Sequence, residues 1–221
     1  MRVLGLDEAG RGCVLGDLVV GGFVLDLDGP ARDLGPGDIP LQAALRAAGA
    51  DDSKVLSHKK RVLAREALRA AGEPQTRSIA PDRIDAGNLN ALEIDAFLDI
   101  VRVAKPDQVF LDAPVNPAGI PRLRAELVKR SGVQRWTIEP KADGTYPVVG
   151  AASIFAKVLR DEGIEALNAE YAAMGGVGSG YPSDPVTRAW LQHFMTNALP
   201  FPPAVRTRWG TIEALRQPRL F

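Results

Sequence analysis

Residues 3–12 read Val3-Leu4-Gly5-Leu6-Asp7-Glu8-Ala9-Gly10-Arg11-Gly12, an apolar run that ends in two acids and a glycine-flanked turn. The apolar run predicts a β-strand that begins almost at the first residue. Asp7 and Glu8 repel each other at the end of this strand, which favours a compensating hard cation such as Mg²⁺ or Mn²⁺. On its own, the pair also fits a polar loop with both acids solvated, the commoner situation for adjacent acids.

The composition indicates an ordinary globular protein of one domain, or of one domain with a small appendage. The chain has 221 residues, 46% of them hydrophobic, with 27 basic and 27 acidic side chains. This charge balance argues against a polycation that coats nucleic acid without specificity, although a local basic groove would remain compatible with it. We find no export signal and no apolar run near the ~20 residues of a membrane span, so we expect a cytoplasmic protein. The single cysteine, Cys13, excludes an internal disulfide and a thiolate metal cluster.

Hydrophobic periodicity predicts an α/β fold. We expect strands over 3–8, 18–25, 75–80, 109–111 and 135–138. We expect helices over 41–48, 57–71, 120–129, 148–174 and 186–195, and another that begins at Asn88 or Asn90 and runs to about 104. The first two strands are close enough to form a hairpin, whereas the later ones alternate with helices, so we predict a mixed β-sheet flanked by helices. We place one domain at 1–185 and a small C-terminal helical extension at 186–221.

Two further acids occupy positions that suit a shared site with Asp7 and Glu8. Asp112 ends a later strand, as Asp7 ends the first. Asp161 shares one face of the predicted long helix with Ser153 and Lys157, at spacings of four residues. Each acid alone is more simply structural, but four acids brought together are what two-metal phosphodiester hydrolysis requires, with ions about 3.5–4 Å apart.

The chain resembles the ribonuclease HII family, the type 2 ribonucleases H, from end to end, and is closer to the archaeal-type branch. The stretches that carry the resemblance are 7–12 (Asp-Glu-Ala-Gly-Arg-Gly), 52–54 (Asp-Ser-Lys), 111–113 (Leu-Asp-Ala), 146–157 (Tyr-Pro-Val-Val-Gly-Ala-Ala-Ser-Ile-Phe-Ala-Lys), 160–161 (Arg-Asp) and 178–184 (Gly-Ser-Gly-Tyr-Pro-Ser-Asp). The first and fourth are highly specific. The resemblance implies an RNase H-like fold.

The resemblance also implies an activity and a set of catalytic acids. The expected enzyme is an endonuclease that hydrolyses the RNA strand of RNA–DNA hybrids and nicks 5′ to ribonucleotides embedded in duplex DNA, as in ribonucleotide excision repair. It would leave 5′-phosphate and 3′-hydroxyl ends and use two Mg²⁺ or Mn²⁺ ions. By analogy, Asp7, Glu8, Asp112 and Asp161 would be the catalytic, metal-binding acids.

Five residues are expected to bind the substrate. The main chain of Gly10, Arg11 and Gly12 would contact the ribose 2′-hydroxyl, the group that separates RNA from DNA. Tyr181 would pack against the sugar at the RNA–DNA junction, although it could instead be a buried turn tyrosine. Lys54 would contact a phosphate as a point charge, but on sequence alone a solvated loop lysine is preferred.

Three features lie outside the matched pattern. Cys13 stands where the family usually has proline, which alters the stiffness of the turn and removes no ligand. Asp143 is a further acid near the site, and we leave it off the catalytic list. Arg206 and Arg208 would contact backbone phosphates or would be exposed arginines of a helical appendage.

The last five residues, Gln217-Pro218-Arg219-Leu220-Phe221, resemble the short peptide with which bacterial proteins dock on the DNA sliding clamp. A poorly ordered tail is the alternative, since chain ends are often mobile. Otherwise we expect a monomer that has no membrane contact and binds nucleic acid.

Two other functions compete with this enzyme. A non-catalytic binder of RNA–DNA hybrids would have little use for four acids, which repel phosphate unless metals are bound. Another two-metal nuclease, such as a resolvase- or integrase-like enzyme, would not need the glycine turn and Tyr181, which suit the sensing of a ribose. We therefore expect a ribonuclease.

Overall fold

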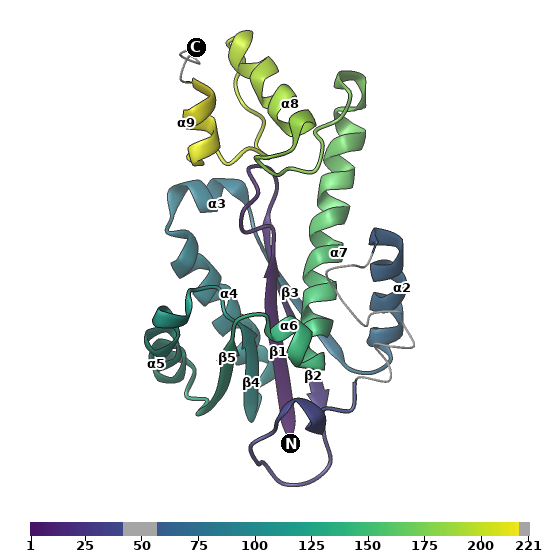
Figure 1. Ribbon diagram of the computed structural model, residues 1–221, viewed down its shortest axis with the longest axis vertical. Helices are drawn as coiled ribbons and strands as arrows, with labels where there is room; N and C mark the ends of the chain where they lie inside the picture. Colours follow the sequence, from purple (N-terminus) through teal and green to yellow (C-terminus); the bar gives the residue numbers. More distant parts are fainter. Residues whose placement is uncertain (42–56, 217–221) are drawn as a thin grey trace. The chain divides into compact units, whose positions relative to one another are not determined.

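A computed structural model describes residues 1–41 and 57–216 of the chain, and it contains a five-stranded mixed sheet (Figure 1). The sheet has the order β3-β2-β1-β4-β5. Its strands are β1 (Arg2–Ala9), β2 (Leu18–Asp26), β3 (Glu73–Ile79), β4 (Gln108–Asp112) and β5 (Arg135–Glu139). Strands β1, β4 and β5 run parallel, so their carboxyl ends meet at one edge of the sheet. The predicted fold class is confirmed.

Helices cover both faces of the sheet, and two adjacent glycines of β2 show how. A side chain at Gly21 would collide with Ala152 of α7 (Pro147–Glu170), whereas a side chain at Gly22 would meet Ile100 of α4 (Leu89–Ala104). Because neighbouring residues of a strand face opposite sides, α7 and α4 lie on opposite faces. The Gly-Gly pair thus allows close contacts on both faces of the sheet.

Helix α7 rests on the central strand with almost no space between the two backbones. A Cβ at Gly5 of β1 would overlap the Val148 carbonyl group. Val148, Val149 and Ala152 belong to the buried core at this contact. Glycine at position 5 therefore fixes the distance at which the helix crosses the strand.

We expect Gly5→Ala to lower the free energy of unfolding by about 3 kcal/mol, because the new methyl group meets backbone that cannot rotate away. Gly163→Ala is the matched control in α7, where a Cβ meets nothing within 4 Å. It should stabilise the helix by about 0.5–1 kcal/mol. Urea unfolding of both variants measures the difference, and equal stabilities would show that the packing at Gly5 is loose.

The remaining described helices are α2 (His58–Arg69), α3 (Pro81–Ala86), α5 (Ile120–Ser131), α6 (Ala142–Thr145), α8 (Pro185–Thr196) and α9 (Gly210–Arg216). Helices α2, α5 and α8 match the predicted segments 57–71, 120–129 and 186–195, whereas α6 was not predicted. The Ser57 hydroxyl accepts a hydrogen bond from the Lys60 amide and so caps α2. Helix α7 ends at Glu170, short of the predicted Met174, and a 3₁₀ turn (Ala172–Met174) leads from it into Gly175 at φ +85°. The helix predicted over 41–48 lies, except for Leu41, outside the described residues.

The chain forms two compact units built from interleaved segments. The first comprises Met1–Ala9, Val20–Arg77 and Glu93–Val158, and the second comprises Gly10–Val19, Ser78–Leu92 and Leu159–Phe221. In the second unit, the core includes the Trp190 ring, which contacts the rings of Tyr171 and Phe194. The predicted division into 1–185 and 186–221 stays a prediction. None of the described helices is long and apolar enough to cross a membrane.

Candidate active site

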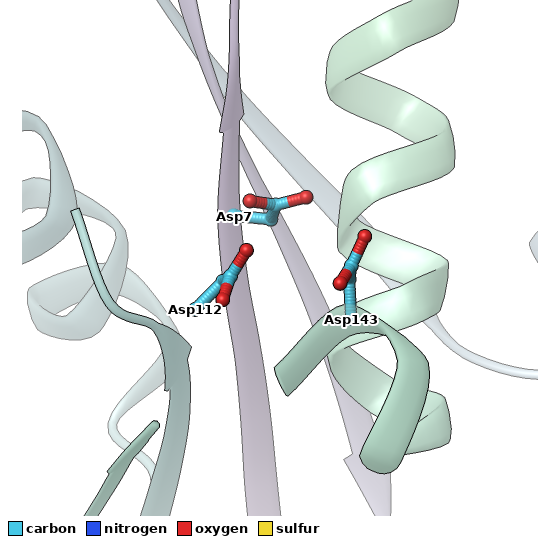
Figure 2. Close-up of side chains that lie close together, drawn as sticks. All are labelled: Asp7, Asp112 and Asp143. Atoms are coloured by element: carbon cyan, nitrogen blue, oxygen red, sulfur yellow. The ribbon is translucent and has the colours of Figure 1, made fainter. Parts of the chain in front are cut away.

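Three aspartates converge at the carboxyl edge of the sheet in the first unit (Figure 2). Asp7 comes from β1, Asp112 from the end of β4, and Asp143 from α6. Leu6 and Leu111 are partners in the parallel ladder, so the next residues, Asp7 and Asp112, reach the edge side by side. One carboxylate oxygen from each of the three lies within 4.8 Å of the others.

Helix α6 brings Asp143 to this edge because its segment is tied to the ends of β4 and β5. The Ala142 amide donates a hydrogen bond to Asp112 Oδ1 at 3.0 Å. Tyr146, directly after α6, packs its ring against Phe110, with centroids 4.8 Å apart, and donates its hydroxyl to Glu139 at 3.0 Å. The position of Asp143 is thus set by the strands themselves.

Burial gives the three-acid group its unusual electrostatics. Asp7 is 4% exposed and Asp143 is 8% exposed. Burial raises the pKa of Asp7 from 3.8 to about 7; the nearby Ser153 hydroxyl and Lys157 ammonium oppose this shift, and the Asp112 charge adds to it. Lys157 Nζ lies 3.8 Å from Asp143 Oδ2, which offsets part of the negative charge.

This donor set fits a divalent metal ion. Carboxylate oxygens are the ligands that Mg²⁺ and Mn²⁺ prefer. Asp7 ionises with difficulty in the absence of a cation, and a divalent ion would remove that penalty. Glu8, half-buried and next to Asp7 in β1, belongs to the same unit.

Asp7 and Asp112 were predicted to share this edge, whereas Asp143 was noted in the sequence and left off the list of catalytic acids. The signal was available: β5 lies next to β4 with the same direction, so the residues that follow β5 also reach this edge. Asp143 comes four residues after the end of β5. The apolar pattern of the sequence does not reveal the path of the chain between β5 and α6, where Lys141 has a left-handed φ of 61°.

Asp161, the fourth predicted acid, is not one of the three converging aspartates. It lies in the second compact unit, where its Oδ1 accepts a hydrogen bond from Arg160 at 3.1 Å. Its metal-binding role therefore stays a prediction.

The predicted ribose-sensing turn also lies in the second unit. Gly10 has φ +86°, and a Cβ there would lie 2.7 Å from the Asp17 carbonyl oxygen, so the position needs glycine. The Cys13 amide closes the turn by donating to the Gly10 carbonyl at 3.2 Å. Around Gly12 there is open space, since a Cβ would meet nothing within 4 Å. The Arg11 side chain donates to Asn90 Oδ1 at 2.5 Å.

Tyr181 belongs to the same unit and is not a buried turn tyrosine. Its side chain is 41% exposed. The Arg160 guanidinium lies over its ring, 4.8 Å from the centroid, and also donates to the Ser179 carbonyl and to Cys13 Sγ. The ring thus has one face held by Arg160 and surface left for a ligand. Lys54, the predicted phosphate contact, lies outside the described residues.

The sequence comparisons agree with these features. The family model described as Ribonuclease HII matches residues 4–212. The chain belongs to the ribonuclease HII family. It is 37% identical to ribonuclease HII of Pyrococcus furiosus, with 98% of this chain and 92% of the relative covered. It is 38% identical to that of Methanothermobacter thermautotrophicus, with 98% and 100% covered.

A solved structure of the PCNA:RNase HII complex from Archaeoglobus fulgidus contains a chain 36% identical to this one, with a TM-score of 0.79 and coverage of 99% and 98%. The similarity to archaeal ribonucleases HII confirms the predicted family and branch. As a ribonuclease HII, the chain is a hydrolase, an endoribonuclease that degrades RNA in RNA–DNA hybrids.

Proposed function

We propose that this ribonuclease HII, besides degrading the RNA strand of hybrids, nicks 5′ to single ribonucleotides embedded in duplex DNA. The products would carry 5′-phosphate and 3′-hydroxyl ends, and the enzyme would act as a cytoplasmic monomer in ribonucleotide excision repair. The group of Asp7, Asp112 and Asp143, of which Asp7 and Asp143 are buried and Asp112 is half-buried, carries the proposal, because acids gathered at one sheet edge suit metal-dependent phosphodiester hydrolysis.

The acids of the first unit would hold two Mg²⁺ or Mn²⁺ ions. Asp7, Glu8 and Asp112 take the roles predicted for them, and Asp143 supplies the fourth carboxylate; Asp161 stands as the alternative fourth acid. When bound, such ions lower the pKa of the attacking water and stabilise the leaving oxygen. Lys157, 3.8 Å from Asp143, would hold that carboxylate in position.

The second unit would recognise the substrate. The main chain of Gly10, Arg11 and Gly12, which is half-buried at Arg11 and exposed at Gly12, would contact a ribose 2′-hydroxyl. The exposed face of Tyr181 offers a stacking surface for a sugar or base at the junction. Lys54 would bind a phosphate.

Four duplexes with one sequence test this function: all-DNA, RNA–DNA hybrid, RNA–RNA, and DNA with a single ribonucleotide. We expect metal-dependent cleavage of the hybrid and of the single-ribonucleotide duplex, with the cut 5′ to the ribonucleotide, and none in EDTA. Cleavage of the hybrid alone would disprove the proposed nicking of embedded ribonucleotides.

Gly12→Ala should lower kcat/KM on the single-ribonucleotide duplex by about tenfold, because the methyl group keeps the ribose from the main chain without disturbing the fold. Gly10→Ala, the comparison variant, should also lose stability, by about 1–2 kcal/mol, because its φ of +86° is strained for alanine. Steady-state kinetics and thermal unfolding separate the two effects. A Gly12→Ala enzyme with unchanged kcat/KM would show that the ribose does not approach this turn.

We also propose that the tail 217–221 binds a DNA sliding clamp. The sequence pattern and the similarity to a protein solved as a PCNA complex support this proposal. The tail itself lies outside the described residues. Deleting Gln217-Pro218-Arg219-Leu220-Phe221 should abolish clamp binding in a pull-down and leave cleavage of a short duplex unchanged. Clamp binding that survives the deletion would disprove the proposal.

A further inference from the structure

Arg206 is a fully buried arginine that belongs to the second unit. Its Nε donates a hydrogen bond to the Gly16 carbonyl at 3.0 Å, and its Nη1 donates to the Arg11 carbonyl at 3.2 Å. The guanidinium lies over the Trp209 ring, 5.0 Å from the centroid. Both alternatives raised by the sequence for Arg206, a phosphate contact and an exposed arginine, are wrong because the side chain has no access to solvent.

The segment that carries Arg206 is fastened to the loop that follows the glycine turn. Leu15 and Val205 form an antiparallel bridge. The Arg206 amide donates to the Val14 carbonyl and the Gly16 amide donates to the Ala204 carbonyl, each at 2.9 Å. These hydrogen bonds fix the backbone on both sides of Arg206. Its side chain therefore reaches the turn from a held segment, about 190 residues later in the chain than Gly16.

Burying a guanidinium costs free energy, so a buried arginine is explained by an interaction that an apolar side chain cannot make. Desolvation lowers the pKa of Arg206, although the charges of Asp17 and Asp85 oppose that shift. A structural apolar side chain would avoid this cost. What an apolar side chain cannot do is fix two main-chain carbonyls with one rigid fork, which the guanidinium does.

The position of the fork relative to the turn is specific. Its Nη1 holds the carbonyl of Arg11, the central residue of the turn. Its Nη2 has no hydrogen-bond partner and lies 3.8 Å from where a Cβ of Gly10 would be. The guanidinium thus supports the turn from its buried side.

We propose that Arg206 is a positioning residue for ribose recognition: it fixes the orientation of the Arg11 peptide group, and hence the main chain that contacts the 2′-hydroxyl. This inference rests on the proposed function of the turn. Arg206 touches no substrate itself, so its loss should impair use of a ribonucleotide and spare the general affinity for duplex DNA.

Arg206→Lys tests the proposal, because lysine keeps the charge and loses the fork. It would substitute well at a phosphate, where a point charge suffices, and poorly between two carbonyls. Arg102→Lys is the matched control, since Arg102 is 74% exposed and pairs with Asp99 at 2.7 Å on the surface.

The measurements are kcat/KM for nicking a duplex with one ribonucleotide and Ki for the all-DNA duplex as a competitor. We expect Arg206→Lys to lower kcat/KM at least tenfold, to leave Ki within twofold, and to retain a cooperative thermal transition. The control should change neither constant. Unchanged kcat/KM, or a matching rise in Ki, would overturn the positioning role.

If Arg206→Lys does not fold, Trp209→Leu replaces it, because without the ring beside it the guanidinium can move and no longer fixes the two carbonyls. It should lower kcat/KM at least threefold with Ki unchanged, and no change in kcat/KM would equally overturn the inference. An unaltered protein that does not nick the ribonucleotide duplex would instead disprove the proposed function, on which the inference rests.

Discussion

Asp143→Asn is expected to lower kcat for ribonucleotide nicking by about 10²- to 10³-fold, whereas Asp161→Asn should cost less than about tenfold. The reason is geometric. Asp143 shares a buried site with Asp7 and Asp112, all within 4.8 Å, and replacing it removes both a charge and a ligand from that site. Asp161 accepts a hydrogen bond from Arg160 and is not one of the three.

The two substitutions are matched in shape and in charge change, so a difference between them reports position alone. Each variant should be checked by thermal unfolding, because Asp143→Asn also removes the partner of Lys157. Mn²⁺ titration monitored by calorimetry should show weakened binding for Asp143→Asn only. A large loss with Asp161→Asn and a small one with Asp143→Asn would restore the acids predicted from sequence and refute the proposal made from the structure.

Asp7→Asn should stabilise the metal-free protein at pH 8 by about 2–4 kcal/mol while it abolishes cleavage. The folded pKa of Asp7 is raised by burial to about 7, from 3.8. Between these values the unfolded chain releases its proton and the folded chain retains it, so stability falls as pH rises through this window. The penalty is complete above about pH 7, and each pKa unit corresponds to about 1.4 kcal/mol.

Urea unfolding in EDTA at pH 5 and pH 8 measures this effect, with Asp28→Asn, an exposed position, as the control. The advantage of Asp7→Asn should be clearly smaller at pH 5. Added Mn²⁺ should stabilise the unaltered protein and leave the variant unchanged, since only the former binds the ion tightly in its folded state. If Asp7→Asn were less stable than the unaltered protein at pH 8, the charged Asp7 carboxylate would not destabilise the folded protein.

The sheet and two of its three converging acids were predictable from sequence because they depend on local patterns. Apolar runs marked β1 and β4, and an aspartate at the end of each run was enough to place Asp7 and Asp112 together once the strands were taken as neighbours.

Asp143, which the structure places beside Asp7 and Asp112, shows where such patterns end. Spacings of four residues drift by about 40° per step around a helix, so Asp161 is turned about 80° from Ser153. Lys157, midway between them, pairs with Asp143 instead. Asp143 itself sits in a four-residue helix after a left-handed lysine, a path fixed by contacts with β4 and β5 and not by local preference.

The interleaving of the two units was also beyond sequence reasoning. Arg206 donates a hydrogen bond to the carbonyl of Arg11, which lies 195 residues earlier in the sequence. The sequence alone does not distinguish a buried arginine from an exposed one. Long-range pairing of this kind depends on the whole fold.

The central claim is that the acids of β1, β4 and α6 cut next to a ribonucleotide. Its most direct test is a DNA duplex with one ribonucleotide, labelled at one end and incubated with Mg²⁺ or Mn²⁺ and either the unaltered protein or Asp7→Asn. We predict one product, cut 5′ to the ribonucleotide, from the unaltered protein and at least about a thousandfold less from Asp7→Asn. Equal cleavage by the two proteins would contradict the claim.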